Sequence, residues 1–132
     1  MKKYYIKLKK NQHSKLIDVI KKHLNLDHKL ALKTITQGSV WSGNSRLKDE
    51  KLLIKDELLT VYFPEFPIYE YTLDAKDIIF EDEYFIVVNK PSGINTNQSP
   101  FSDIDCLSYG VQKYYDDKKI DYRVNVINRL DK

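Results

Sequence analysis

The stretch that decides the fold of the chain's second half runs from Ile78 to Asn89 and reads IIFEDEYFIVVN. Apolar, mostly β-branched and aromatic runs flank the acidic triplet at 81–83, which predicts two antiparallel strands joined by a turn. The second run, residues 84–89, is almost continuously apolar, as is typical of a well-buried strand. The next four residues, KPSG at 90–93, predict a turn that ends this strand.

Two more elements are expected downstream of this hairpin. Apolar residues at helical spacing predict a helix over roughly residues 104–116. The partial alternation from Tyr122 to Ile127 indicates a further strand. Upstream, Pro64 and Pro67 favour extended backbone and mark the best linker.

The sequence of the first half predicts a small module that contains both helices and strands. Strands are expected at residues 4–9, 40–41 and 58–63. Two helices are expected between the first and second of these strands, one after Ser14 as N-cap and one over residues 28–37. For the second helix, Asp27 is the N-cap, Gly38 is the stop, and Leu30, Leu32 and Ile35 supply the buried side.

Together these elements predict an α+β chain in three parts. A small α/β module covers residues 1–63, a linker covers 64–75, and residues 76–132 begin a mixed, mainly antiparallel β-sheet domain.

The composition is that of a globular chain and excludes several classes. Of 132 residues, 42% are hydrophobic and 31% charged, with 4 Gly and 4 Pro, which excludes collagen and low-complexity disorder. No apolar run approaches the ~18 residues of a membrane span, and no apolar segment follows the basic N-terminus as in a signal peptide. A single cysteine, Cys106, fits a reducing compartment, so we expect a cytoplasmic protein that binds no membrane.

Charge is divided unevenly along the chain. Residues 1–63 carry a net charge of +8 and residues 64–132 a net charge of −5. A basic module of this kind is typical of polyanion binding, whereas the alternative is a lysine-rich surface that is merely solvated.

Two motifs in the second half of the chain resemble those of a known protein family. Residues 78–93 resemble the opening of the catalytic domain of RluA-type pseudouridine synthases: strand, acidic turn, strand, then Asn-Lys-Pro-Ser-Gly. Asn128 to Asp131, which begin 35 residues after Gly93, resemble the family's catalytic His/Asn-Arg-Leu-Asp motif. The helix expected near residues 107–115 falls where the family has one.

The first half is similar to the small RNA-binding domain first known from ribosomal small-subunit protein four. The matching segments are QGSV at 37–40 and KDELLTV at 55–61. The usual Val-Asn-Gly is replaced by WSGN at 41–44, and Asp27 to Lys29 stand where an Arg/Ser pair often opens the second helix.

The resemblance implies an isomerase that converts uridine to pseudouridine in rRNA or tRNA, without metal or redox cofactor. Asp131 would be catalytic, either attacking the ribose or uracil or removing a proton, and must be ionised for this. Arg129 and Asn128 would hold the opened RNA, whose target nucleotide must be flipped out. Candidate phosphate contacts of the first module are Lys22, Lys29 and Lys33.

The family's catalytic domain is longer than the ~60 residues that follow the linker, and so short a piece buries a poor core. We therefore expect the chain to be an N-terminal portion of such an enzyme, cut at the Asp131 motif and inactive alone. The alternative is a non-enzymatic RNA-binding protein with a vestigial synthase segment. No metal site is expected, because His13, His23 and His28 have no partner at ligand spacing. The sequence indicates no oligomeric state.

Overall fold

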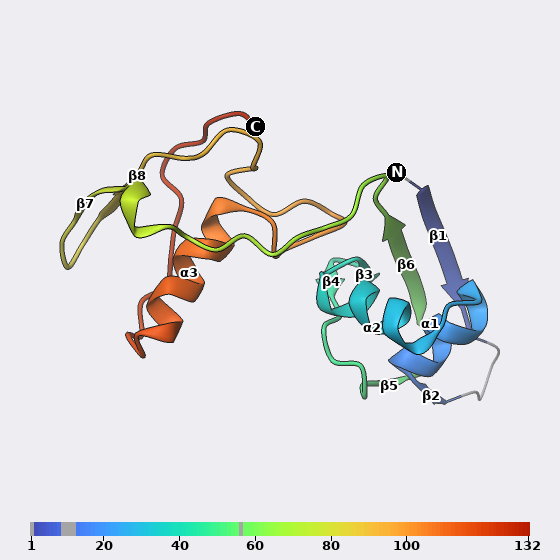
Figure 1. Cartoon of the computed structure of the whole chain (residues 1–132). Coiled ribbons are helices and arrows are strands. Elements are labelled where there is room, and N and C mark those ends of the chain that lie inside the picture. The colour runs from blue at the N-terminus through green and yellow to red at the C-terminus, as the bar shows by residue number, and fades with distance from the viewer. Residues whose placement is uncertain (1, 9–12, 56) are drawn as a thin grey trace. The chain divides into compact units, whose positions relative to one another are not determined.

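The computed structural model describes residues 2–8, 13–55 and 57–132. Helices and antiparallel sheets are mixed, so the protein is α+β as expected. The chain divides into two compact units (Figure 1). Unit 1 comprises residues 1–68 and 100–102, and unit 2 comprises residues 69–99 and 103–132.

Unit 1 contains a four-stranded antiparallel sheet. The strands, in sheet order, are β1 (Lys2–Lys7), β6 (Leu58–Phe63), β3 (Val40–Ser42) and β4 (Ser45–Arg46). Side-chain alternation buries Leu59 and Val61 of β6 on one face, against Ile6 of β1. Lys9, at the end of the expected first strand, and Asp56, in the expected turn before β6, lie outside the described residues.

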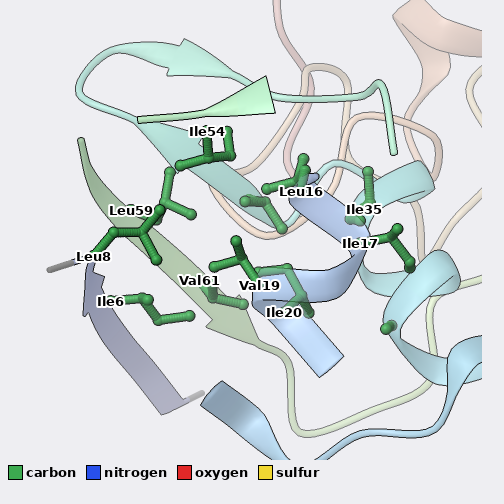
Figure 2. Packing of buried hydrophobic residues seen from close by; sticks show 12 residues of the cluster. Ile6, Leu8, Leu16, Ile17, Val19, Ile20, Ile35, Ile54, Leu59 and Val61 are labelled. Carbon is green, nitrogen blue, oxygen red and sulfur yellow. The ribbon is translucent and has the colours of Figure 1, made fainter. Parts of the chain in front are cut away.

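Two helices, α1 (Leu16–Leu24) and α2 (His28–Thr36), supply the rest of the unit 1 core. Figure 2 shows the side chains of α1 packed against those of the sheet. The fully buried members include Leu16, Ile20, Ile35, Ile54 and Leu59.

The expected N-cap at Ser14 is wrong. Ser14 lies in β2 (Ser14–Lys15), which pairs with β5 (Leu53–Ile54), and Lys15 is the N-cap residue with no side-chain cap. The first amides of α1 are instead satisfied by backbone, because Leu16 N–H donates to Leu52 O (2.8 Å) and Ile17 N–H to Glu50 O (3.0 Å).

The expected limits of α2 are confirmed, but one of its buried residues is not. Asp27 Oδ1 accepts from Leu30 N–H at 2.8 Å, and Gly38 follows the helix with φ +93°. Leu30 itself is 46% exposed. The buried stripe is Ala31, Thr34 and Ile35, whose i, i+3, i+4 spacing directs them to one side of the helix.

Unit 2 contains the expected hairpin, formed by β7 (Ile78–Glu81) and β8 (Ile86–Val88). Asp82 shapes its turn by accepting from the N–H groups of Tyr84 (2.8 Å) and Phe85 (2.7 Å). The expectation of a well-buried second strand is wrong, since Val87 is 45% exposed. Within the described residues these two strands form a sheet of their own, and no further strand is hydrogen-bonded to them.

The remaining regular elements of unit 2 are η1 (Ala75–Asp77) and α3 (Leu107–Asp117). The strand expected over residues 122–127 is absent from this described segment. The side chain of Gln112 on α3 takes the place of a strand partner, because its amide donates to Tyr122 O (2.8 Å) and accepts from Val124 N–H (3.0 Å). Among the described residues, no helix is both long and apolar enough to cross a membrane.

Candidate functional site

A pair of hydrogen bonds joins the loop after β8 to the segment that carries Asp131. Thr96 Oγ1 donates to Leu130 O at 2.7 Å and accepts from Leu130 N–H at 3.2 Å. The final segment of the chain accordingly runs beside this loop in Figure 1. The loop after the KPSG turn and the C-terminal motif, 34 positions apart at these residues, are thus joined within unit 2.

Thr96 is also attached to the beginning of α3. Its carbonyl accepts from Ser108 N–H at 3.0 Å, and the preceding carbonyl of Asn95 accepts from Leu107 N–H at 2.8 Å. These bonds satisfy two of the amides that a helix leaves free at its N-terminus. Thr96 is therefore buried between the first turn of α3 and Leu130, with 6% of its surface exposed.

The loop between β8 and Thr96 is organised around Lys90. Its ammonium group donates to Ile94 O at 2.7 Å and to Pro91 O at 3.3 Å. Gly93, between these acceptors, has φ +90°, a conformation that glycine adopts without steric cost. The KPSG turn thus uses its lysine to hold the backbone that leads into Thr96.

An apolar cavity of about 270 Å³ lies next to this junction. Its walls come from β8, from the first two turns of α3 and from the segment 124–130. The polar side chains among its lining residues are those of Lys90, Thr96, Ser108, Asn125 and Asn128. An apolar pocket with a few placed polar groups is the usual form of a small-ligand site.

The three residues of the C-terminal motif that are expected to act in the site do not all lie at the cavity. Asn128 lines the cavity, whereas Arg129 and Asp131 are exposed and do not line it. Within the described part of the chain, the Asp131 carboxylate has no hydrogen bond or ion pair. Its neighbour Leu130 lines the cavity and is bonded to Thr96 through its backbone.

Glu81 attaches the hairpin to α3 and so sets the cavity walls. Its carboxylate accepts from Tyr114 Oη at 2.9 Å and from Tyr115 Oη at 2.8 Å. Burial, followed by the hydrogen bond to Glu81, raises the pKa of Tyr115. A phenol that stays protonated remains a donor, which keeps β7 fixed on this helix.

A second carboxylate, that of Glu70, binds two residues of α3 that do not line the cavity. It accepts from Tyr109 Oη at 2.7 Å and from the ammonium of Lys113. Burial, together with the bond to Glu70, raises the pKa of Tyr109 to about 12. The hydrogen bonds from Lys113 and Tyr109 lower the pKa of Glu70.

The basic candidates lie on the helices of unit 1. Lys22 is on α1, and Lys29 and Lys33 are on α2; all three are exposed. Lys29 and Lys33 are four residues apart and share a face of α2. The structure therefore brings these two together, while Lys22 belongs to the neighbouring helix.

Sequence reasoning missed two features. Thr96 gave no signal, because a threonine in an irregular loop has no pattern that points to a partner 34 residues away. Arg46 stacks on the Trp41 ring at 4.5 Å from the ring centroid, since the two face each other across β3 and β4. Alternation on paired strands could have suggested that contact.

Among the described residues, no group of three or more His, Cys, Asp or Glu is placed to hold a metal ion. Compared with models of known protein families, the chain matches none. No curated protein sequence matches it either.

Proposed function

We propose that this chain is the N-terminal portion of an RNA pseudouridine synthase, inactive alone, with residues 1–63 acting as an RNA-binding module of the type found in ribosomal small-subunit protein four. Residues 76–132 begin the RluA-type catalytic domain, and 64–75 link the two parts. The reaction isomerises a uridine of rRNA or tRNA. Asp131 is the catalytic carboxylate, and the enzyme works in the cytoplasm.

The observation that supports the proposal is the junction between Thr96 and Leu130. The loop that follows the KPSG turn and the Asn-Arg-Leu-Asp motif are far apart in sequence, yet two hydrogen bonds join them beside an apolar cavity. A catalytic site that combines the segment after the KPSG turn with the C-terminal motif requires a junction of this kind. The cavity has a volume of about 270 Å³, and Asn128 supplies an amide to its lining that could bind the polar edge of a base.

The exposed state of Asp131 and Arg129 fits a site that is completed by RNA. A carboxylate at the surface can be reached by the ribose or the uracil, as both attack and proton removal require. An exposed guanidinium can bind a phosphate with its planar fork. The flipped nucleotide would bring its own phosphate to this region, at a cost of a few kcal/mol for unstacking.

The test begins with the reading frame downstream of the Lys132 codon. A continuation into Thr-Ser-Gly, which follows the motif in the family, is the expected result. A stop codon at that point contradicts the enzyme and favours the alternative, a non-enzymatic RNA-binding protein with a vestigial synthase segment.

The protein translated from the whole frame is then assayed for pseudouridine on total RNA by mass spectrometry, beside its Asp131→Asn variant. Asparagine keeps the shape of the side chain and removes its charge. We expect pseudouridine from the wild type and none from the variant. Equal modification by the two proteins rejects Asp131 as the catalytic group.

A further inference from the structure

The side chain of Thr96 makes an unusual pair of contacts: one hydroxyl group binds both polar backbone atoms of a single residue. Oγ1 donates to Leu130 O (2.7 Å) and accepts from Leu130 N–H (3.2 Å). A hydroxyl can do both, because it carries one donor and two acceptor lone pairs. The atoms it holds belong to the peptide groups on either side of Leu130, which lead to Arg129 and to Asp131.

Those contacts restrict the backbone on both sides of Leu130. A peptide group is planar, so the orientation of the Leu130 carbonyl also orients the amide of Asp131. The same holds for the Leu130 amide and the carbonyl of Arg129. The hydroxyl therefore limits the directions in which the Arg129 and Asp131 side chains leave the chain.

The other side of Thr96 is held by regular structure. Its carbonyl accepts from Ser108 N–H (3.0 Å) in the first turn of α3. Thr96 is buried, whereas Leu130 is 57% exposed. The helix α3 therefore holds Thr96, and the buried side chain of Thr96 in turn holds the backbone of Leu130. Leu130 lies in an exposed segment that lacks regular secondary structure.

We propose that Thr96 is a positioning residue that fixes the Asn128–Asp131 segment for catalysis through its hydroxyl group. The catalytic part of this inference rests on the proposed function, whereas the hydroxyl clamp does not. Asp131 has no hydrogen bond or ion pair of its own among the described residues. The backbone clamp at Leu130 is therefore the contact that limits where its carboxylate lies.

The first test measures amide hydrogen exchange by NMR in the 132-residue chain. In the wild type, the Leu130 amide is expected to exchange more slowly than the amides of Arg129 and Asp131. Thr96→Val keeps the shape of the side chain and removes the hydroxyl, so the Leu130 amide should exchange about fivefold faster. Thr96→Ser retains the hydroxyl and should restore the slow rate.

The Ser108 amide is the internal control, because it donates to the backbone of Thr96 and should keep its rate in every variant. If Thr96→Val fails to fold, the exchange rates of the Leu130, Arg129 and Asp131 amides in the wild type still test the clamp. A Leu130 amide that exchanges as fast as its two neighbours overturns the clamp. An unchanged rate in a folded Thr96→Val protein overturns it as well.

The second test is the pseudouridine assay on the protein from the whole reading frame. Thr96→Val should lower kcat roughly tenfold or more while KM for RNA is unchanged, and Thr96→Ser should restore kcat. If the wild type forms pseudouridine and Thr96→Val has the same kcat, the positioning role is wrong and the proposed function stands. If Leu130 protection depends on the hydroxyl and no pseudouridine forms, the clamp stands and the proposed function fails.

Discussion

The ring of Tyr71 lies directly over Gly110 of α3. A Cβ atom at Gly110 would be 2.5 Å from Tyr71 Cδ1 and 2.6 Å from Cε1, distances that real Cβ atoms do not adopt. The same tyrosine donates its backbone N–H to Ile104 O at 2.8 Å. Gly110 therefore lets the chain before η1 pack closely against the helix that forms one wall of the cavity.

Gly110→Ala should destabilise unit 2. Alanine favours a helix over glycine by about 0.5–1 kcal/mol, but the new methyl group would have to displace an aromatic ring that is held at its backbone. Overpacking of this kind costs about 1–3 kcal/mol, so we expect net destabilisation. Urea unfolding followed by circular dichroism measures the change.

A double-mutant cycle provides the control for this contact. In a Tyr71→Ala background the ring is absent, and Gly110→Ala should then be neutral or stabilising. Destabilisation of equal size in both backgrounds would show that the ring is not the cause.

Ser39 of unit 1 should be sensitive to loss of its hydroxyl. Its Oγ donates to Phe101 O at 2.6 Å and accepts from Gln37 Nε2 at 2.8 Å, and the residue is fully buried. Ser39→Ala leaves both partners unsatisfied at a cost of about 1–3 kcal/mol. Fluorescence of Trp41, whose Nε1 donates to Pro100 O at 2.6 Å, reports the unfolding.

Ser45→Ala is the matched control, because Ser45 is exposed at the start of β4 and should change the stability by less than about 0.5 kcal/mol. Equal effects of the two serine variants would contradict the buried hydrogen-bond network.

The helix cap formed by Asp27 predicts the order of stability of two variants at this position. Asp27→Ala removes the acceptor for Leu30 N–H and should destabilise unit 1 by about 1 kcal/mol, whereas Asp27→Asn keeps an acceptor and should cost less. Thermal unfolding of the three proteins checks the order. A loss in Asp27→Asn as large as that in Asp27→Ala would assign the effect to charge rather than to capping.

Elements governed by local contacts could be predicted from the sequence. Asp27 caps a helix through an N–H three residues away, and the hairpin turn depends on Asp82 and residues next to it. The residues that determine such a helix start or turn lie within a few positions of it in the sequence. The limits of α2 and the existence of the β7–β8 hairpin were predicted for this reason.

Elements governed by distant partners could not be predicted in the same way. Ser14 has the right chemistry for an N-cap, but backbone carbonyls of Leu52 and Glu50 satisfy the first turn of α1. Residues 122–127 alternate as a strand does, but the side chain of Gln112 on α3 binds the Tyr122 carbonyl and the Val124 amide. The Thr96–Leu130 junction depends on a contact of this second kind, so the sequence did not predict it.

Glu70 predicts an acid-sensitive contribution to the stability of unit 2. Hydrogen bonds from Lys113 and Tyr109 lower its pKa from the ordinary 4.5, so the unfolded chain binds the proton more readily. Its contribution is therefore present above pH 4.5 and is lost as the pH falls through the lower, folded-state pKa. Both ion-pair side chains are 41% exposed, so the effect is small and weakens with salt.

Glu70→Gln should flatten the dependence of unfolding free energy on pH below this value, and urea midpoints across the acid range measure it. Lys113→Gln removes the partner and should produce a similar, smaller flattening. The same pH dependence in the wild type and Glu70→Gln would contradict the assignment.

The shared face of Lys29 and Lys33 predicts a salt-dependent RNA contact. Replacing both with alanine should weaken binding of structured RNA and lower the slope of log K against log salt by about 1.5, because each phosphate contact contributes about 0.7–0.9 to that slope. Filter binding at several salt concentrations measures both quantities. Replacement of Lys118 and Lys119 in unit 2 removes the same charge from exposed positions and should leave the slope nearly unchanged. If the two pairs lower the slope equally, overall charge accounts for the binding and the face of α2 does not contact RNA.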